Sequence, residues 1–139
     1  MDLPEPLNSV ARRVANGLFL AHPEFQAGID IVEGGHLEVS LPAPDGSQAG
    51  ALVVCTARDA DIWVHFAPPQ MWYAVEDEQE LVIVVGQLLR DDLLFARTAD
   101  VDGAWTGTTL IRRIEDLDLK EGDTATVLSW SGARDQILR

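Results

Sequence analysis

The stretch GALVVCTARDADIWVHFAPPQMWYAVEDEQELVIVVGQLLRDDLLFART, residues 50–98, decides how this chain folds. It contains two apolar, strand-like runs, 52–56 and 62–66, which are joined by a short turn. A connection of only a few residues favours antiparallel pairing of the two strands. In the second run, Trp63 and His65 alternate with apolar side chains and therefore share one face of the strand. The pattern leaves open whether this face is exposed or covered by helices.

An aromatic segment and an acidic segment follow these two strands. Two prolines end the second strand, and we expect residues 70–75 (QMWYAV) to form an aromatic loop. The acidic run 76–80 precedes residues 81–89, in which leucine and valine recur at helical spacing. Because acids at its start complement a helix dipole, we predict a helix over 81–89. A strand is the alternative, since residues 82–85 are β-branched.

The remaining segments predict one more helix and five more strands. Residues 4–21 carry an apolar stripe at spacings of three and four, which is typical of a helix. Residues 28–41 alternate around a Gly-Gly turn and predict a hairpin. An Asp-Gly turn separates the strand-like runs 93–98 and 105–113, and residues 124–131 are β-prone. The predicted order is α-β-β-β-β-α-β-β-β. Short connections then favour an α+β fold, a mainly antiparallel sheet with two helices packed on one face.

Length and composition indicate a single α+β domain over residues 1–139. A chain of 139 residues has the usual size of one domain, and 47% hydrophobic residues are enough for a packed core. The loop over residues 42–50 is too short to be a domain linker. We expect residues 133–139 at the C-terminus to fray.

The charge of the chain is strongly acidic. It has 23 Asp and Glu residues against 10 Lys and Arg, for a net charge of -13 at pH 7. A field of this sign repels phosphate backbones and anionic membranes, so we expect neither nucleic acid nor a membrane as a partner. The same field speeds encounter with a basic protein. The N-terminus has no signal-peptide pattern, which favours a cytoplasmic location.

The sequence contains no motif that predicts catalysis or metal binding. The single cysteine, Cys55, lies in an apolar run, where a small buried side chain is expected. His22, His36 and His65 do not have the spacing of zinc ligands. The chain also lacks a nucleophile elbow and a glycine-rich phosphate loop. We therefore expect no enzyme activity, no cofactor and no metal site.

Two groups of residues are candidates for contact with a partner: Trp63 with His65 in the strand-like run 62–66, and the aromatic and acidic segment over residues 72–80. Aromatic side chains rimmed by acids suit an interface that receives a basic protein. For the aromatic and acidic segment, the alternative is an ordinary helix start with its aromatic residues tucked onto the sheet. The candidate partner-binding residues are Trp63, His65, Trp72, Tyr73, Glu76, Asp77, Glu78 and Glu80.

Residues 37–98 resemble small immunity proteins of bacterial polymorphic-toxin systems. The likeness consists of a strand rich in Val, His and Phe, an aromatic loop, an acidic helix start, and a strand leading to Trp105-Thr106-Gly107. Where such proteins commonly carry a second histidine near the aromatic loop, this chain has Pro68, Pro69 and Gln70. The resemblance implies a cytoplasmic protein that binds and blocks a cognate toxin domain.

Three hypotheses for function follow. The first is a non-catalytic immunity protein that neutralises a basic bacterial toxin domain. The second is a secretion chaperone for an effector protein. Such chaperones are small acidic dimers that commonly finish on a helix, whereas this chain finishes on the β-prone run 124–131. The third is a small enzyme of unknown type that uses His65 with Asp59 or Asp61. The sequence leaves open whether the protein is a homo-oligomer, and a stable homodimer would favour the chaperone over the immunity protein.

Overall fold

Helix α1 (Ser9–Ala21) is the first element of the computed structural model, which describes residues 7–57 and 61–139. Asn8 caps this helix, because its Oδ1 accepts a hydrogen bond from the backbone N–H of Ala11 at 2.9 Å. The apolar stripe is buried against the rest of the protein, with Val14 and Leu18 fully inaccessible. The helix predicted over residues 4–21 is thus confirmed from residue 9 onward, and its predicted first turn falls partly outside the described residues.

The first sheet contains five strands in the order β1-β2-β3-β4-β5, and each strand is antiparallel to its neighbours. A short 3₁₀ helix, η1 (Pro23–Gly28), leads into it from α1. Sequential hairpins explain this order, since each strand pairs with the next one along the chain. The strands are β1 (Ile29–Val32), β2 (His36–Pro42), β3 (Ala51–Thr56), β4 (Ile62–Ala67) and β5 (Met71–Val75).

The expectation of an aromatic loop over residues 70–75 was wrong. Residues 71–75 form β5, the edge strand of the first sheet, in which Met71 and Val75 are buried and Trp72 is exposed. The register pairs Met71 with Phe66 and Val75 with Ile62, so the chain reverses directly after the two prolines. Cross-strand packing of apolar side chains therefore stabilises a segment that local sequence assigned to a loop.

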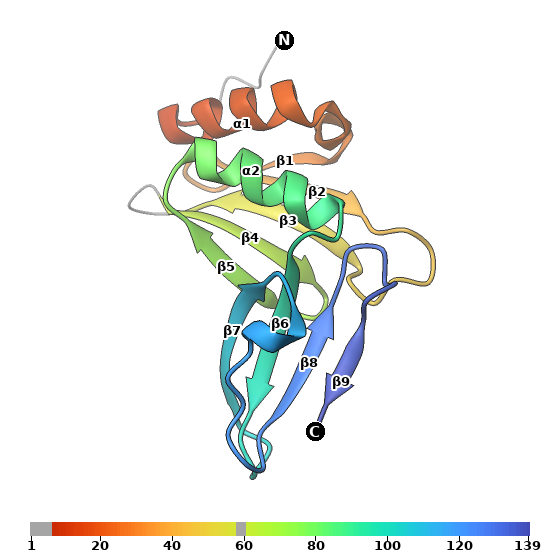
Figure 1. Ribbon diagram of the computed structural model, residues 1–139. Helices are drawn as coiled ribbons and strands as arrows, with labels where there is room; N and C mark the ends of the chain where they lie inside the picture. Colours follow the sequence, from red (N-terminus) through yellow and green to blue (C-terminus); the bar gives the residue numbers. More distant parts are fainter. Residues whose placement is uncertain (1–6, 58–60) are drawn as a thin grey trace.

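Helix α2 (Glu78–Leu89) confirms the helix predicted for residues 81–89. Asp77 is its N-cap, and its Oδ1 accepts from the N–H of Glu80 at 2.8 Å. The buried stripe of the helix includes Leu81, Val85 and Leu88, which outweighs the strand preference of its β-branched residues. Both helices cover the same face of the first sheet (Figure 1).

The last four strands form a second sheet with the order β7-β6-β8-β9, again antiparallel throughout. An Asp-Gly turn joins its first two strands, as predicted, with Asp100 Oδ1 accepting from the N–H of Ala104 at 3.0 Å. The expected frayed tail was wrong, since residues 136–138 pair with β8. The elements are β6 (Leu94–Ala99), β7 (Trp105–Ile111), η3 (Ile114–Asp116), β8 (Thr124–Leu128) and β9 (Gln136–Leu138).

The α+β class and the order of helices and strands are confirmed, with two strands added and the strands divided between two sheets. A single cluster of buried residues joins the helices, the first sheet and the near end of the second sheet. At the junction, Phe66 of β4 packs against Phe95 of β6, with ring centroids 4.8 Å apart. A smaller cluster lies on the other face of the second sheet and consists of Leu94, Ala96, Ile111 and Val127.

Candidate functional site

The face of the first sheet that points away from the helices contains the best candidate site. In β4, Ile62 and Phe66 are buried in the cluster under the helices. Alternation along the strand therefore places Trp63 and His65 on the opposite face. This is the face of the first sheet that α1 and α2 do not cover (Figure 1). The choice that the sequence left open is thereby settled in favour of the open face.

Trp63, His65 and Trp72 come together on this open face and form what we call the aromatic cluster. His65 pairs with Trp72 across β4 and β5, and their rings are stacked, with centroids 3.6 Å apart and planes 8° from parallel. The ring of Trp63 contacts Trp72 edge-on, at a centroid distance of 6.0 Å and an angle of 82°. Trp72 is 41% exposed, so the cluster presents an aromatic surface to solvent.

His65 is the most enclosed member of the aromatic cluster. It is only 9% exposed, and its Nδ1 is buried with no hydrogen-bond partner in the part of the chain that the structure describes. Burial lowers the pKa of His65 below its ordinary value, and an interaction with the backbone of Phe66 opposes this effect. The imidazole is therefore neutral at pH 7 and supports Trp72 as a flat, uncharged surface.

A row of side chains crosses the open face from Trp63 toward two carboxylates. The register places Cys55 beside Trp63, Glu38 beside Cys55, and Asp30 beside Glu38. Both acids are exposed. Burial and the nearby charge of Glu38 raise the pKa of the Cys55 thiol to about 11. The thiol is therefore protonated at pH 7, which makes it a poor nucleophile.

The other predicted contact residues do not share the open face. Tyr73 points to the opposite side of β5 and packs against the core. The acidic residues surround the first turn of α2, where Glu80 accepts from the N–H of Glu76 at 3.0 Å. Glu78 forms an ion pair of 3.1 Å with Arg13 of α1, and Asp77 caps the helix. These contacts give the acidic segment a role in helix formation; whether it also binds a partner stays a prediction.

Arg97 and Trp105 form a second aromatic contact, which sequence reasoning did not foresee. The guanidinium of Arg97 lies 3.8 Å from the centroid of the Trp105 ring. Its Nη1 also donates to the carbonyl oxygen of Pro69 at 2.8 Å, which ties β6 to the turn between β4 and β5. The pairing places Arg97 opposite Thr108, and a register shift follows between Thr98 and Ala99 near Trp105. Single-strand patterns carry no signal for a contact that depends on such a shift.

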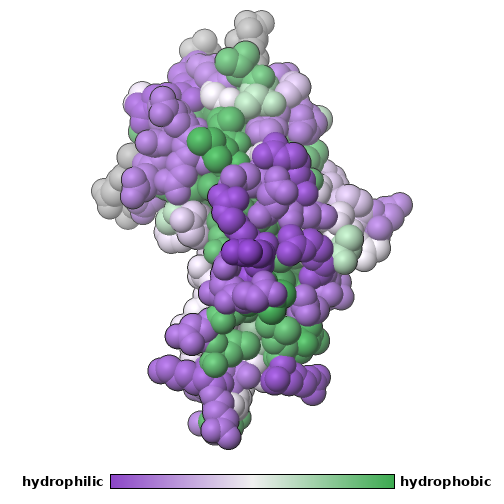
Figure 2. Space-filling model, in the orientation of Figure 1, coloured by the Kyte–Doolittle hydropathy of each residue, from purple (hydrophilic) through white to green (hydrophobic). Residues whose placement is uncertain are grey.

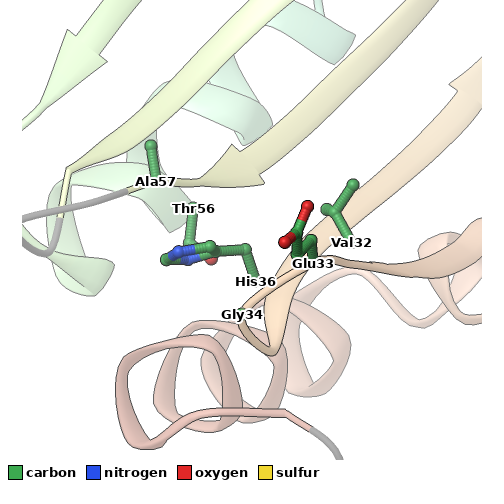
Figure 3. Close-up of a pocket in the computed structure, with 6 residues that line it drawn as sticks. All are labelled: Val32, Glu33, Gly34, His36, Thr56 and Ala57. Atoms are coloured by element: carbon green, nitrogen blue, oxygen red, sulfur yellow. The ribbon is translucent and has the colours of Figure 1, made fainter.

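A shallow pocket of about 430 Å³ lies at one end of the first sheet (Figure 3). It combines one carboxylate with one imidazole, and His36 Nδ1 lies 3.3 Å from Nδ2 of Asn8, the cap of α1. The residues that follow it, 58–60, are outside the described part of the chain. The pocket therefore offers weaker chemistry than the aromatic cluster. It is lined by Val32, Glu33, Gly34, His36, Thr56 and Ala57.

Residues 7–57 and 61–139 contain no group of three or more His, Cys, Asp or Glu side chains placed to hold a metal ion. Within the same ranges, no helix combines the length and the apolar character needed to cross a membrane. The side of the molecule that carries the helices is mostly hydrophilic (Figure 2).

Comparisons with protein-family models, with curated proteins and with solved structures found no match. The fold and the site define an α+β protein with one face of its larger sheet covered by helices and the other open and aromatic. Function is therefore inferred from the residues of this face.

Proposed function

We propose that this protein is a non-catalytic binding protein that acts in the bacterial cytoplasm as an immunity protein against a basic toxin domain. The observation that carries the proposal is the aromatic cluster on the open sheet face. Trp72 is 41% exposed and held in place by stacking on His65. Rigid, partly exposed aromatic residues are the typical anchors of protein interfaces, because they bury a large area with little loss of side-chain freedom.

The reactive groups of the open face support binding over catalysis. The Cys55 thiol is protonated at pH 7, because its pKa is raised to about 11. His65 is neutral and its ring is covered by Trp72. For the enzyme hypothesis, Asp61 is exposed directly before β4, and Asp59 lies outside the described residues. A general base must be able to reach the proton that it removes, and the stacked His65 is poorly placed for this.

Charge supports a basic partner. The chain has a net charge of -13, and strands β1 to β5 contain no lysine or arginine. Such a surface attracts a cationic protein and increases its association rate in a salt-dependent way. The resemblance to immunity proteins of polymorphic-toxin systems points to the same class of partner.

The test uses a basic toxin domain encoded beside this protein. Expression of the toxin domain alone should stop bacterial growth, and co-expression of the immunity protein should restore it. Trp72→Ala should abolish this rescue, whereas the matched control Trp105→Ala should not, although Trp105 is 66% exposed. The association rate measured with purified proteins should fall as salt is raised.

Failure of the wild-type protein to rescue growth or bind the toxin domain would contradict the proposal. Rescue that survives Trp72→Ala but is lost when Glu76 is replaced by lysine would move the interface to the start of α2. A stable homodimer that holds a partly unfolded effector would instead favour the secretion chaperone. Light scattering of the free protein and of its complex distinguishes the last outcome.

A further inference from the structure

The aromatic cluster forms a corner that is partly exposed to solvent. One face of the Trp72 ring is covered by His65, at a centroid distance of 3.6 Å, yet Trp72 keeps 41% of its surface exposed. The Trp63 ring stands at 82° to Trp72, at a centroid distance of 6.0 Å. Two nearly perpendicular indole rings therefore border one another on an open face. Indole faces are electron-rich and attract cations, and tryptophan does so more strongly than tyrosine or phenylalanine.

Negative charge lies on the same sheet face as this corner. Glu38 is two strands away from Trp63, with Cys55 between them in the register. Two strand spacings amount to about 10 Å, a span that one long cationic side chain lying along the face can bridge. Asp30 lies one strand further along the row. The side chain that lies between Glu38 and Trp63 in the register is that of Cys55. Because this side chain is small, no bulky group stands between the carboxylate and the indole in this row.

We propose that the corner of Trp63 and Trp72, together with the carboxylate of Glu38, recognises an arginine side chain of the protein partner. This inference rests on the proposed function, and it names the chemistry by which the partner is bound. Strands β1 to β5 contain no lysine or arginine that could occupy the corner from within the sheet. The proposal therefore takes the cation from the partner.

Arginine fits this corner better than lysine. Its planar guanidinium stacks flat on an indole while its N–H groups still donate to a carboxylate, whereas lysine is a compact and strongly hydrated point charge. The protein itself contains an example of this geometry. The guanidinium of Arg97 lies 3.8 Å from the Trp105 centroid while its Nη1 donates to Pro69 O at 2.8 Å. Trp72 keeps 41% of its surface exposed, and strands β1 to β5 of its own sheet contain no arginine.

The test compares two capped tripeptides, acetyl-Gly-Arg-Gly-amide and acetyl-Gly-citrulline-Gly-amide. Citrulline has nearly the shape of arginine without its charge, so the difference between the peptides isolates the cation. The indole N–H signals of ¹⁵N-labelled protein are followed by NMR during titration. We expect the arginine peptide to bind about two- to five-fold more tightly than the citrulline peptide, with the signals of Trp63 and Trp72 shifting.

Three variants locate the site. Glu38→Gln should bring the affinity ratio of the two peptides toward one, and because Glu38 is exposed this change leaves the fold intact. Trp72→Ala should remove the shift of the Trp63 signal. Trp105→Ala is the matched control and should change neither result, since the face of Trp105 is already occupied by Arg97.

Equal affinity for the two peptides, or no shift of either signal, overturns the inference. These failures are distinguishable from failure of the proposed function. A toxin domain that requires Trp72 although the two peptides bind equally would leave the immunity function standing without arginine recognition. Selective binding of the arginine peptide at Trp63 and Trp72, with no toxin domain neutralised, would leave the recognition site standing without the immunity function.

Discussion

Replacement of Phe95 by alanine tests whether the two sheets fold as one unit. Phe95 is fully buried at the start of β6, and its ring packs edge-on against Phe66 of β4 at 4.8 Å and 61°. Phe66 in turn faces Trp130 at 6.3 Å, so this group of rings joins the second sheet to the main core. We expect Phe95→Ala to lower the free energy of unfolding by about 3–5 kcal/mol.

The magnitude has two parts. Most of it comes from the buried apolar surface that is lost and the cavity that is left, and about 0.5–1.5 kcal/mol belongs to the aromatic pair. Domains are typically stable by about 5–15 kcal/mol, so this change removes a large fraction of the total. Phe95→Leu retains most of the volume and should cost about 1–2 kcal/mol, which keeps the measurement possible if the alanine variant does not fold.

The assay is urea unfolding followed by tryptophan fluorescence and by circular dichroism. Leu94→Ala is the matched control, because Leu94 is equally buried but belongs to the smaller cluster on the other face of the second sheet. If residues 1–139 form one domain, both variants should shift a single transition with an unchanged slope in urea. A loss below about 1 kcal/mol for Phe95→Ala would refute the reasoning. Two separate transitions for Leu94→Ala would refute it as well.

Further predictions concern the titration of His65 and Cys55 and the replacement of two glycines by alanine. Because burial lowers the pKa of His65 in the folded protein, this histidine binds a proton more readily in the unfolded chain. The free energy of unfolding of the wild type relative to His65→Gln should therefore stay constant above pH 6.5 and fall below it, as measured by urea unfolding. The Cys55 thiol, with a pKa of about 11, should react with iodoacetamide at pH 8 far more slowly in folded than in unfolded protein, as mass spectrometry can show. In thermal unfolding, Gly17→Ala should stabilise α1 by about 0.5–1 kcal/mol, because the nearest atom to the new Cβ is 3.9 Å away. Gly28→Ala should cost about 1–3 kcal/mol, because its Cβ would overlap the carbonyl oxygen of Ser40.

Elements with a strong periodic pattern of apolar residues, or with a clear turn signal beside them, could be predicted. The alternation of β2 and β4 and the Asp-Gly turn before β7 are local signals, and each fixes a strand without reference to the rest of the chain. Helix α2 was predictable because its cap and its apolar stripe outweighed the β-branched residues. The division into two sheets was not predictable. It depends on β6 pairing with β8 and not with a strand of the first sheet, and a pairing between strands that no turn joins directly leaves no periodicity in either strand.

The open aromatic face shows which features local sequence patterns could not predict. Alternation placed Trp63 and His65 on one side of β4, yet it could not say which side the helices cover, since both faces carry large apolar side chains. Trp72 fell within the expected loop, although Met71, Tyr73 and Val75 already alternate with Trp72. Two prolines before this segment suggested irregular structure, whereas the chain uses them to reverse direction and bring Trp72 opposite His65. The stack on His65 exists only because this reversal occurs, so the geometry on which the proposed arginine recognition rests arises from a pairing that local sequence does not encode.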